Sequence, residues 1–119
     1  MPDELRIRLH AHAGSWRLML SGVVGLQTAE TLEHVAAVAL RAPTADSLCL
    51  DMAAVTSLDT TGLATLAARR READLRGLPF RIVRPSAAVA AAILASGGSE
   101  LRNVLDFQDR GRSGTRCSR

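Results

Sequence analysis

The chain has 119 residues, the length of one domain rather than two, of which 47% are hydrophobic and 23% charged. That composition is typical of a folded globular domain and excludes a chain that is disordered throughout. No apolar run approaches the roughly 20 residues needed to span a bilayer. The opening Met1-Pro2-Asp3-Glu4 also lacks the basic-then-apolar pattern of a signal peptide, so we expect neither a membrane nor an exported protein.

The net charge of +3 arises from the C-terminal residues 109–119. Residues 109–119 hold four of the 15 basic residues and one of the 12 acids, so residues 1–108 balance to zero. A nucleic-acid-binding domain usually carries its cations as a patch on the folded body, and this balance therefore favours no direct contact with nucleic acid. We expect one domain, residues 1–108, followed by a basic, disordered tail, residues 109–119.

The two cysteines, Cys49 and Cys117, have no Cys or His neighbour at the spacing of a metal site. Cys49 lies in an apolar run and is expected to be buried, whereas Cys117 lies in the tail and is expected to be free. Cysteines that form neither a disulfide nor a metal site are typical of proteins in the reducing cytosol, so we expect a cytoplasmic protein.

The first third of the chain predicts a β-hairpin followed by a helix. Apolar and polar residues alternate over 5–12 and again over 16–21, which is the period of half-buried strands. Gln27 or Thr28 stands where a helix N-cap belongs, and apolar residues then recur at helical spacing until Pro43 ends the pattern.

The rest of the chain alternates between strand and helix. In order, we expect a buried strand at 47–52, a helix from Asp59-Thr60-Thr61-Gly62 to Gly77, a strand at 80–83, a helix from Pro85-Ser86 to Gly97-Gly98, and a short strand at 103–107. The order β-β-α-β-α-β-α-β predicts an α/β fold with a mixed sheet of four to five strands, the later strands being parallel.

The sequence supplies little for catalysis. His10 and His12 would share one face of a strand, but no third metal ligand lies nearby, and we expect both to be exposed, as we expect of His34. The Gly22-Val23-Val24-Gly25 stretch lacks the third glycine and the lysine of a phosphate-binding loop. We therefore expect no enzyme, no bound metal and no cofactor.

The stretch from Val55 to Leu63 is the most informative part of the chain and has two interpretations. In the first, Asp59 caps a helix and Gly62 permits close packing. In the second, a hydroxyl at the helix N-terminus is a regulatory site, because a phosphate there lies close to free backbone N–H groups and adds nearly two negative charges to the surface.

Three segments of the chain resemble the STAS domains of small bacterial anti-sigma-factor antagonists. These are residues 50–66 with their strand, aspartate, hydroxyl pair, glycine and leucine; Gly22 with Thr28-Ala29-Glu30-Thr31-Leu32; and Arg84-Pro85-Ser86 with the helix that follows. The resemblance covers about residues 5 to 108. It implies a STAS-like α/β fold with the helices packed mainly on one side of the sheet.

The resemblance also implies a partner-switching mechanism. In that family the unmodified antagonist binds an anti-sigma factor, usually a serine kinase of the histidine-kinase-like ATPase fold, and thereby frees a sigma factor. The kinase phosphorylates the hydroxyl residue that follows the aspartate, which blocks binding, and a metal-dependent serine/threonine phosphatase reverses the modification. Carried over to this chain, the phosphoacceptor is Thr60 and the partner-binding residues are Asp59, Thr61, Gly62, Leu63, Gly22, Val23, Gly25, Gln27 and Thr28.

Two other functions stay open from the sequence. The chain could be a constitutive STAS subunit, for example of a lipid-transport ATPase complex, in which Thr60 serves a permanent interface. An enzyme or small-molecule binder would need a pocket that the sequence does not reveal. For the oligomeric state we expect a monomer or a weak homodimer, since the exposed first hairpin could pair edge to edge.

Overall fold

The computed structural model describes residues 4–96 and 100–106. Five strands form one sheet in the order β1-β2-β3-β4-β5, with β1 antiparallel to β2 and each later pair parallel. The elements are β1 (Leu5–His12), β2 (Ser15–Val24), α1 (Ala29–Arg41), β3 (Ser47–Leu58), α2 (Thr60–Leu75), β4 (Phe80–Val83), α3 (Ala87–Ala95), a 3-10 turn (Arg102–Val104) and β5 (Leu105–Asp106). The predicted order and class are confirmed.

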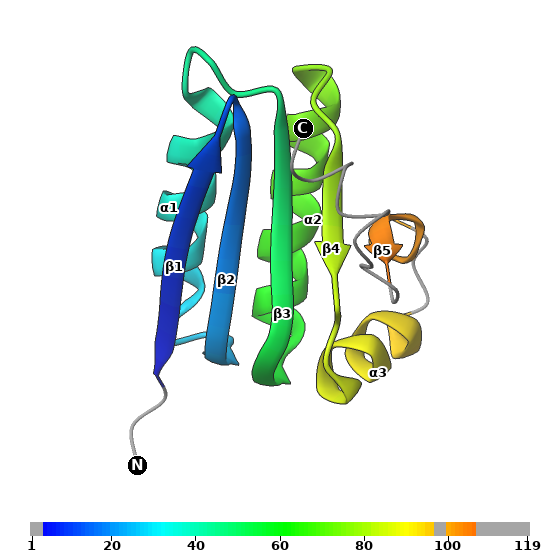
Figure 1. The fold of residues 1–119 in the computed structure, drawn as a ribbon. Coiled ribbons are helices and arrows are strands. Elements are labelled where there is room, and N and C mark those ends of the chain that lie inside the picture. Colours follow the sequence, from blue (N-terminus) through cyan, green and yellow to red (C-terminus); the bar gives the residue numbers. More distant parts are fainter. Residues whose placement is uncertain (1–3, 97–99, 107–119) are drawn as a thin grey trace.

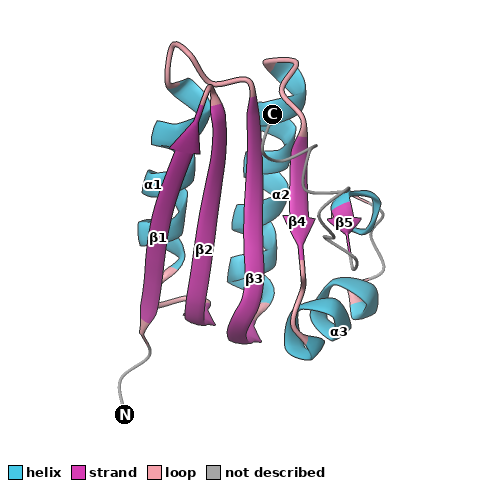
Figure 2. Cartoon of the chain, viewed as in Figure 1, coloured by secondary structure: helices cyan, strands magenta, loops and turns pink. Residues whose placement is uncertain are grey.

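The helices lie mainly on one side of the sheet, as expected. Figures 1 and 2 show α1 and α2 side by side behind the strands, with α3 beside the lower ends of β3 and β4. The alternation along the strands decides which side chains face the helices: Leu18, Leu20 and Leu50 join the core. Their neighbours Met19 and Asp51 point to the opposite, helix-free face, which we call the open face.

The middle strand is longer than its apolar run predicts. Strand β3 continues through Leu58 instead of ending at residue 52, because its pairing with β2 shifts twice. Each shift inserts an extra residue into β3, so that apolar residues stop alternating and the pattern of a strand disappears from the sequence. The first six residues, 47–52, are buried as expected, and Cys49 is fully buried.

The ends of the other elements are close to their predicted positions. Strand β2 runs three residues beyond residue 21, and α3 ends at Ala95, before the two glycines. The last strand is reduced to Leu105–Asp106, preceded by a 3-10 turn. Gly97, Gly98, Phe107, Cys117 and the expected tail lie outside the described residues.

Candidate functional site

Asp59 connects the start of α2 to the loop between β2 and α1. Its Oδ1 accepts a hydrogen bond of 2.9 Å from the Gly62 N–H, which is the predicted helix cap. Its Oδ2 accepts a second hydrogen bond of 3.1 Å from the Leu26 N–H, 33 residues earlier in the chain. One exposed carboxylate therefore fixes the position of the loop relative to the helix.

The same hydrogen bonds stabilise Asp59 as a carboxylate. The Gly62 N–H and then the Leu26 N–H lower the pKa of Asp59 below its ordinary value, against a smaller effect of desolvation. Because each oxygen accepts a hydrogen bond from the backbone, Asp59 anchors both the loop and the start of the helix.

Two glycines make this arrangement possible. A Cβ on Gly25 would lie 2.5 Å from Asp59 Oδ2, so a larger residue would push the carboxylate away from the loop. A Cβ on Gly62 would lie 2.7 Å from the backbone oxygen of Val24 and 2.7 Å from a Leu58 methyl. Both glycines therefore serve close approach, which for Gly62 is the packing role that the sequence suggested.

Thr60 is the first residue of α2 and is exposed. Within the described part of the chain its hydroxyl has no hydrogen-bond partner, and it is available to an approaching molecule. Thr61 is half-buried, and its carbonyl accepts a hydrogen bond of 3.0 Å from Thr65 Oγ1. Of the two neighbouring threonines, Thr60 is thus the more accessible.

The loop before α1 is held from inside by Thr28. Its buried hydroxyl donates to the Val23 carbonyl at 2.8 Å and accepts from the Gly25 N–H at 3.0 Å. The side chain makes no capping bond to α1, so the expected N-cap is correct in position but not in its hydrogen bond. Gly22 lies within β2 at a φ of +109°, in close contact with the backbone of Glu4, and so has a conformational reason to be glycine.

The structure also reveals an exposed apolar side chain beside this site, Leu26, that was not among the residues predicted from the sequence. Leu26 is 74% exposed, although its backbone N–H is bonded to Asp59. Gln27 beside it is exposed too, and Leu63 on α2 is half-buried. The sequence gives only one sign of Leu26: it is an apolar residue between a glycine and a glutamine, just before a predicted helix.

The structure places the predicted residues in two connected segments, the end of β2 with the loop that follows it and the start of α2. Asp59 brings Gly25, Gly62 and the exposed Thr60 together, while Thr28 and Gly22 support the backbone behind them.

His10, His12 and His34 are exposed. Among the residues that the structure describes, no group of three or more His, Cys, Asp or Glu side chains could hold a metal ion. None of the described helices is both long and apolar enough to cross a membrane.

The family follows from a sequence comparison. The family model described as "Mlab, STAS domain" matches residues 7–105, so the chain belongs to the STAS domain family. No curated protein matches the sequence.

Solved structures of similar fold include several anti-sigma factor antagonists. The structure of the antagonist SpoIIAA in its unphosphorylated form has a TM-score of 0.76 at 15% identity, covering 92% of this chain and 95% of that chain. SpoIIAA of Bacillus in its phosphorylated form gives 0.73 at 14% identity, with coverages of 93% and 98%. An antagonist from Mycobacterium paratuberculosis gives 0.73 at 25% identity, with coverages of 91% and 90%. The chain thus has an antagonist-like STAS fold at low sequence identity.

Proposed function

We propose that this protein is an anti-sigma factor antagonist that acts by partner switching, with Thr60 as the phosphorylated residue. In the unmodified state it binds an anti-sigma factor that is a serine kinase of the histidine-kinase-like ATPase fold. Phosphorylation of Thr60 ends that binding, and a serine/threonine phosphatase restores it. The observation that carries the proposal is the exposed Thr60 hydroxyl beside a carboxylate that anchors both the helix and the neighbouring loop.

The position of Thr60 suits a switch. A phosphate at the first residue of α2 lies near the positive end of the helix dipole, which favours it locally. The same phosphate stands next to the ionised Asp59, so it concentrates negative charge where the partner must approach. About 2 to 3 kcal/mol of repulsion and desolvation would weaken the partner's affinity roughly 30- to 150-fold.

The surface around Thr60 suits protein binding. Leu26 offers an exposed apolar side chain on the loop, and Leu63 offers a half-buried one on α2, and both belong to the segments that Asp59 joins. Protein interfaces combine buried apolar contacts with neighbouring polar groups. The existence of SpoIIAA in unphosphorylated and phosphorylated forms supports the same mechanism for this chain.

A binding series with the host's kinases of this fold tests the proposal. Thr60→Ala should bind as the unmodified protein does and resist inactivation by ATP, whereas Thr60→Asp should bind roughly 30-fold more weakly or worse. Thr31→Ala is the matched control, since Thr31 is an exposed threonine on α1. Equal affinity of all three variants, and equal loss of binding after ATP, would show that Thr60 is not the switch.

The constitutive-subunit alternative makes a different prediction from the same surface. Leu26 and Thr60 would then be covered permanently, and the protein would purify from its host in a stable complex with a transport ATPase. Thr60 would carry no phosphate under any growth condition. Co-purification followed by identification of the partner separates the two functions.

A further inference from the structure

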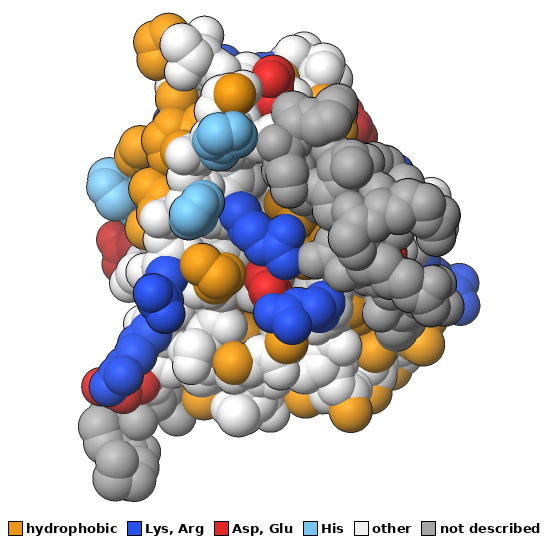
Figure 3. Space-filling model, viewed as in Figure 1, with side chains coloured by type: hydrophobic (Ala, Val, Ile, Leu, Met, Phe, Trp, Pro, Cys, Tyr) orange, Lys and Arg blue, Asp and Glu red, His pale blue; other side chains and the backbone are white. Residues whose placement is uncertain are grey.

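The open face of the sheet carries a concentration of arginine that the neutral composition of residues 1–108 conceals. Figure 3 views this face and shows basic side chains gathered over β1 to β4 around a central acidic side chain. Strand alternation places four arginines here, Arg6, Arg8, Arg17 and Arg81, together with the acids Asp51 and Asp106. A fifth arginine, Arg84, follows β4 and reaches this face through its hydrogen bonds to Asp51. Among the residues that the structure describes, arginines therefore outnumber the acids named on this face.

A hollow of about 370 Å³ lies within this face. It forms where β3 bulges: Met19 pairs with Asp51 but Ser21 pairs with Ala54, so β3 has one residue more than β2 over this stretch. The bulge exposes Ala53 and Ala54, whose small side chains leave space above the sheet. The volume is within the range of small-molecule sites.

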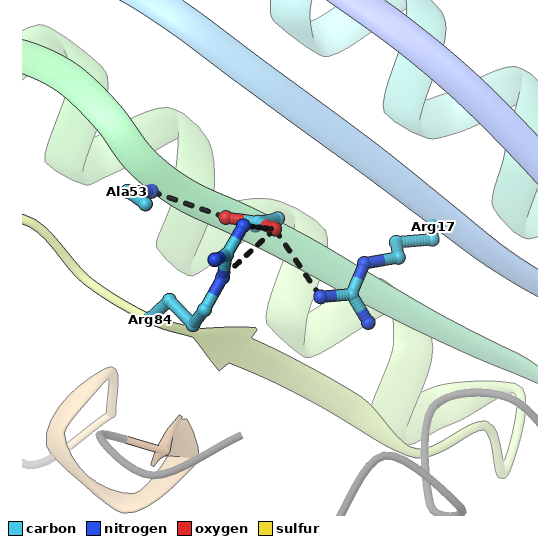
Figure 4. A network of polar contacts seen from close by, with 4 residues as sticks. Arg17, Ala53 and Arg84 are labelled. Atoms are coloured by element: carbon cyan, nitrogen blue, oxygen red, sulfur yellow. Dashed lines mark hydrogen bonds and ion pairs between the residues drawn. The ribbon is translucent and has the colours of Figure 1, made fainter. Parts of the chain in front are cut away.

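Asp51 forms the charged base of the hollow. It is only 3% exposed, and Arg84 contacts its Oδ2 at 2.6 Å and Arg17 at 3.2 Å, while the Ala53 N–H donates to Oδ1 at 3.2 Å (Figure 4). Burial would raise the pKa of Asp51, but these hydrogen bonds outweigh it and lower the pKa. One carboxylate thus contacts two guanidinium groups.

Two further arginines line the hollow from the opposite side. Arg6 and Arg8 on β1 are exposed and have no ion-pair partner among the described residues. Arg84 reaches the hollow from the other side, at the end of β4, with a φ of +48° that is uncommon for arginine. Guanidinium groups on both sides of a hollow that is also lined by Met19, Ala53 and Ala54 favour an anion with an apolar body.

We infer that this hollow binds a small organic phosphate, with Arg6, Arg8 and Arg84 contacting the phosphate and Met19, Ala53 and Ala54 contacting the apolar part. Nucleic acid is disfavoured because the single Trp and Phe80 pack toward the helices, leaving no aromatic side chain on this face for base stacking among the described residues. The hollow is distinct from the Thr60 site, since Asp51 lies eight residues before Asp59 on an extended strand.

NMR titration of the full chain with phenyl phosphate tests the inference. We expect saturable shifts of the Met19, Ala53 and Ala54 amides with a dissociation constant of about 1 mM or tighter. The double variant Arg6→Gln/Arg8→Gln should weaken binding at least tenfold, by about 1.4 kcal/mol. The matched control Arg71→Gln/Arg102→Gln removes two exposed arginines that do not line the hollow and should leave the affinity unchanged.

Three results would overturn the inference. One is the absence of saturable shifts at the hollow. Another is equal weakening by the control pair, which would mean nonspecific attraction. The last is binding only to anionic lipid vesicles or to an oligonucleotide without any response to phenyl phosphate, which would assign the face to a macromolecule. Thermal unfolding of each variant confirms that the exposed substitutions leave the fold intact.

Discussion

Gly62→Ala is the substitution that tests most sharply how the switch helix is positioned. In most helices, replacing glycine by alanine stabilises by up to about 1 kcal/mol. Here the new Cβ would lie 2.7 Å from both the Val24 carbonyl oxygen and a Leu58 methyl, and the carbonyl belongs to the rigid end of β2. Overpacking of this kind costs about 1–3 kcal/mol, so the clash should outweigh the gain in helix propensity.

We therefore expect Gly62→Ala to lower the free energy of unfolding by about 1–2 kcal/mol, or the Tm by roughly 4–8 °C for a domain of this size. Thermal and urea unfolding followed by circular dichroism measure it. Ala64→Gly, at an exposed position of the same helix, is the control, and should lose about 1 kcal/mol through propensity alone. A rise in Tm for Gly62→Ala would refute the close contact between α2 and the end of β2.

Three further predictions address the site and the open face. Gly25→Ala should displace the Asp59 carboxylate from the Leu26 N–H, which would appear as faster hydrogen exchange of that amide with little change at Gly62. Leu26→Ser should weaken binding of the anti-sigma factor about tenfold or more without lowering Tm, whereas Leu75→Ser, at an 89% exposed leucine near the other end of α2, should change neither. Asp51→Asn leaves two arginines facing a neutral group and should cost about 2 kcal/mol at pH 7. Because the folded pKa of Asp51 lies below 3.8, its contribution is present above that pH and is lost as the pH falls through the lowered value, so the wild type and the variant should converge in stability in acid.

The sequence predicted the order of the elements because each has a clear local pattern. The structure contains a strand where residues 5–12 alternate, a helix where apolar residues recur after Thr28, and a helix capped by the aspartate that precedes Thr60. Strand β3 was predicted too short, since its two extra residues relative to β2 depend on pairing with another strand and leave no local signal.

The candidate site was only partly predictable for the same reason. The cap by Asp59 follows from four consecutive positions, residues 59–62, but its bond to Leu26 joins residues 33 apart and required the fold. The arginines of the open face come from three separate segments of residues 1–108, whose charges balance to zero, so composition concealed them. The hairpin, the parallel direction of the later strands and the contacts within one turn could be predicted, whereas the bulges in β3 and the hydrogen bonds between distant segments could not.

The most direct test of the proposed function is the phosphorylation state of Thr60 in the native host. Trypsin cleaves after Arg41 and Arg69, so one peptide of residues 42–69 carries Thr60 together with its neighbouring threonines, and fragmentation locates the modification. The proposal predicts one added phosphate on Thr60 that is absent from the Thr60→Ala variant and lost on treatment with a serine/threonine phosphatase. An unmodified Thr60 under conditions in which the partner kinase is active, or a phosphate found only on another residue, would contradict it.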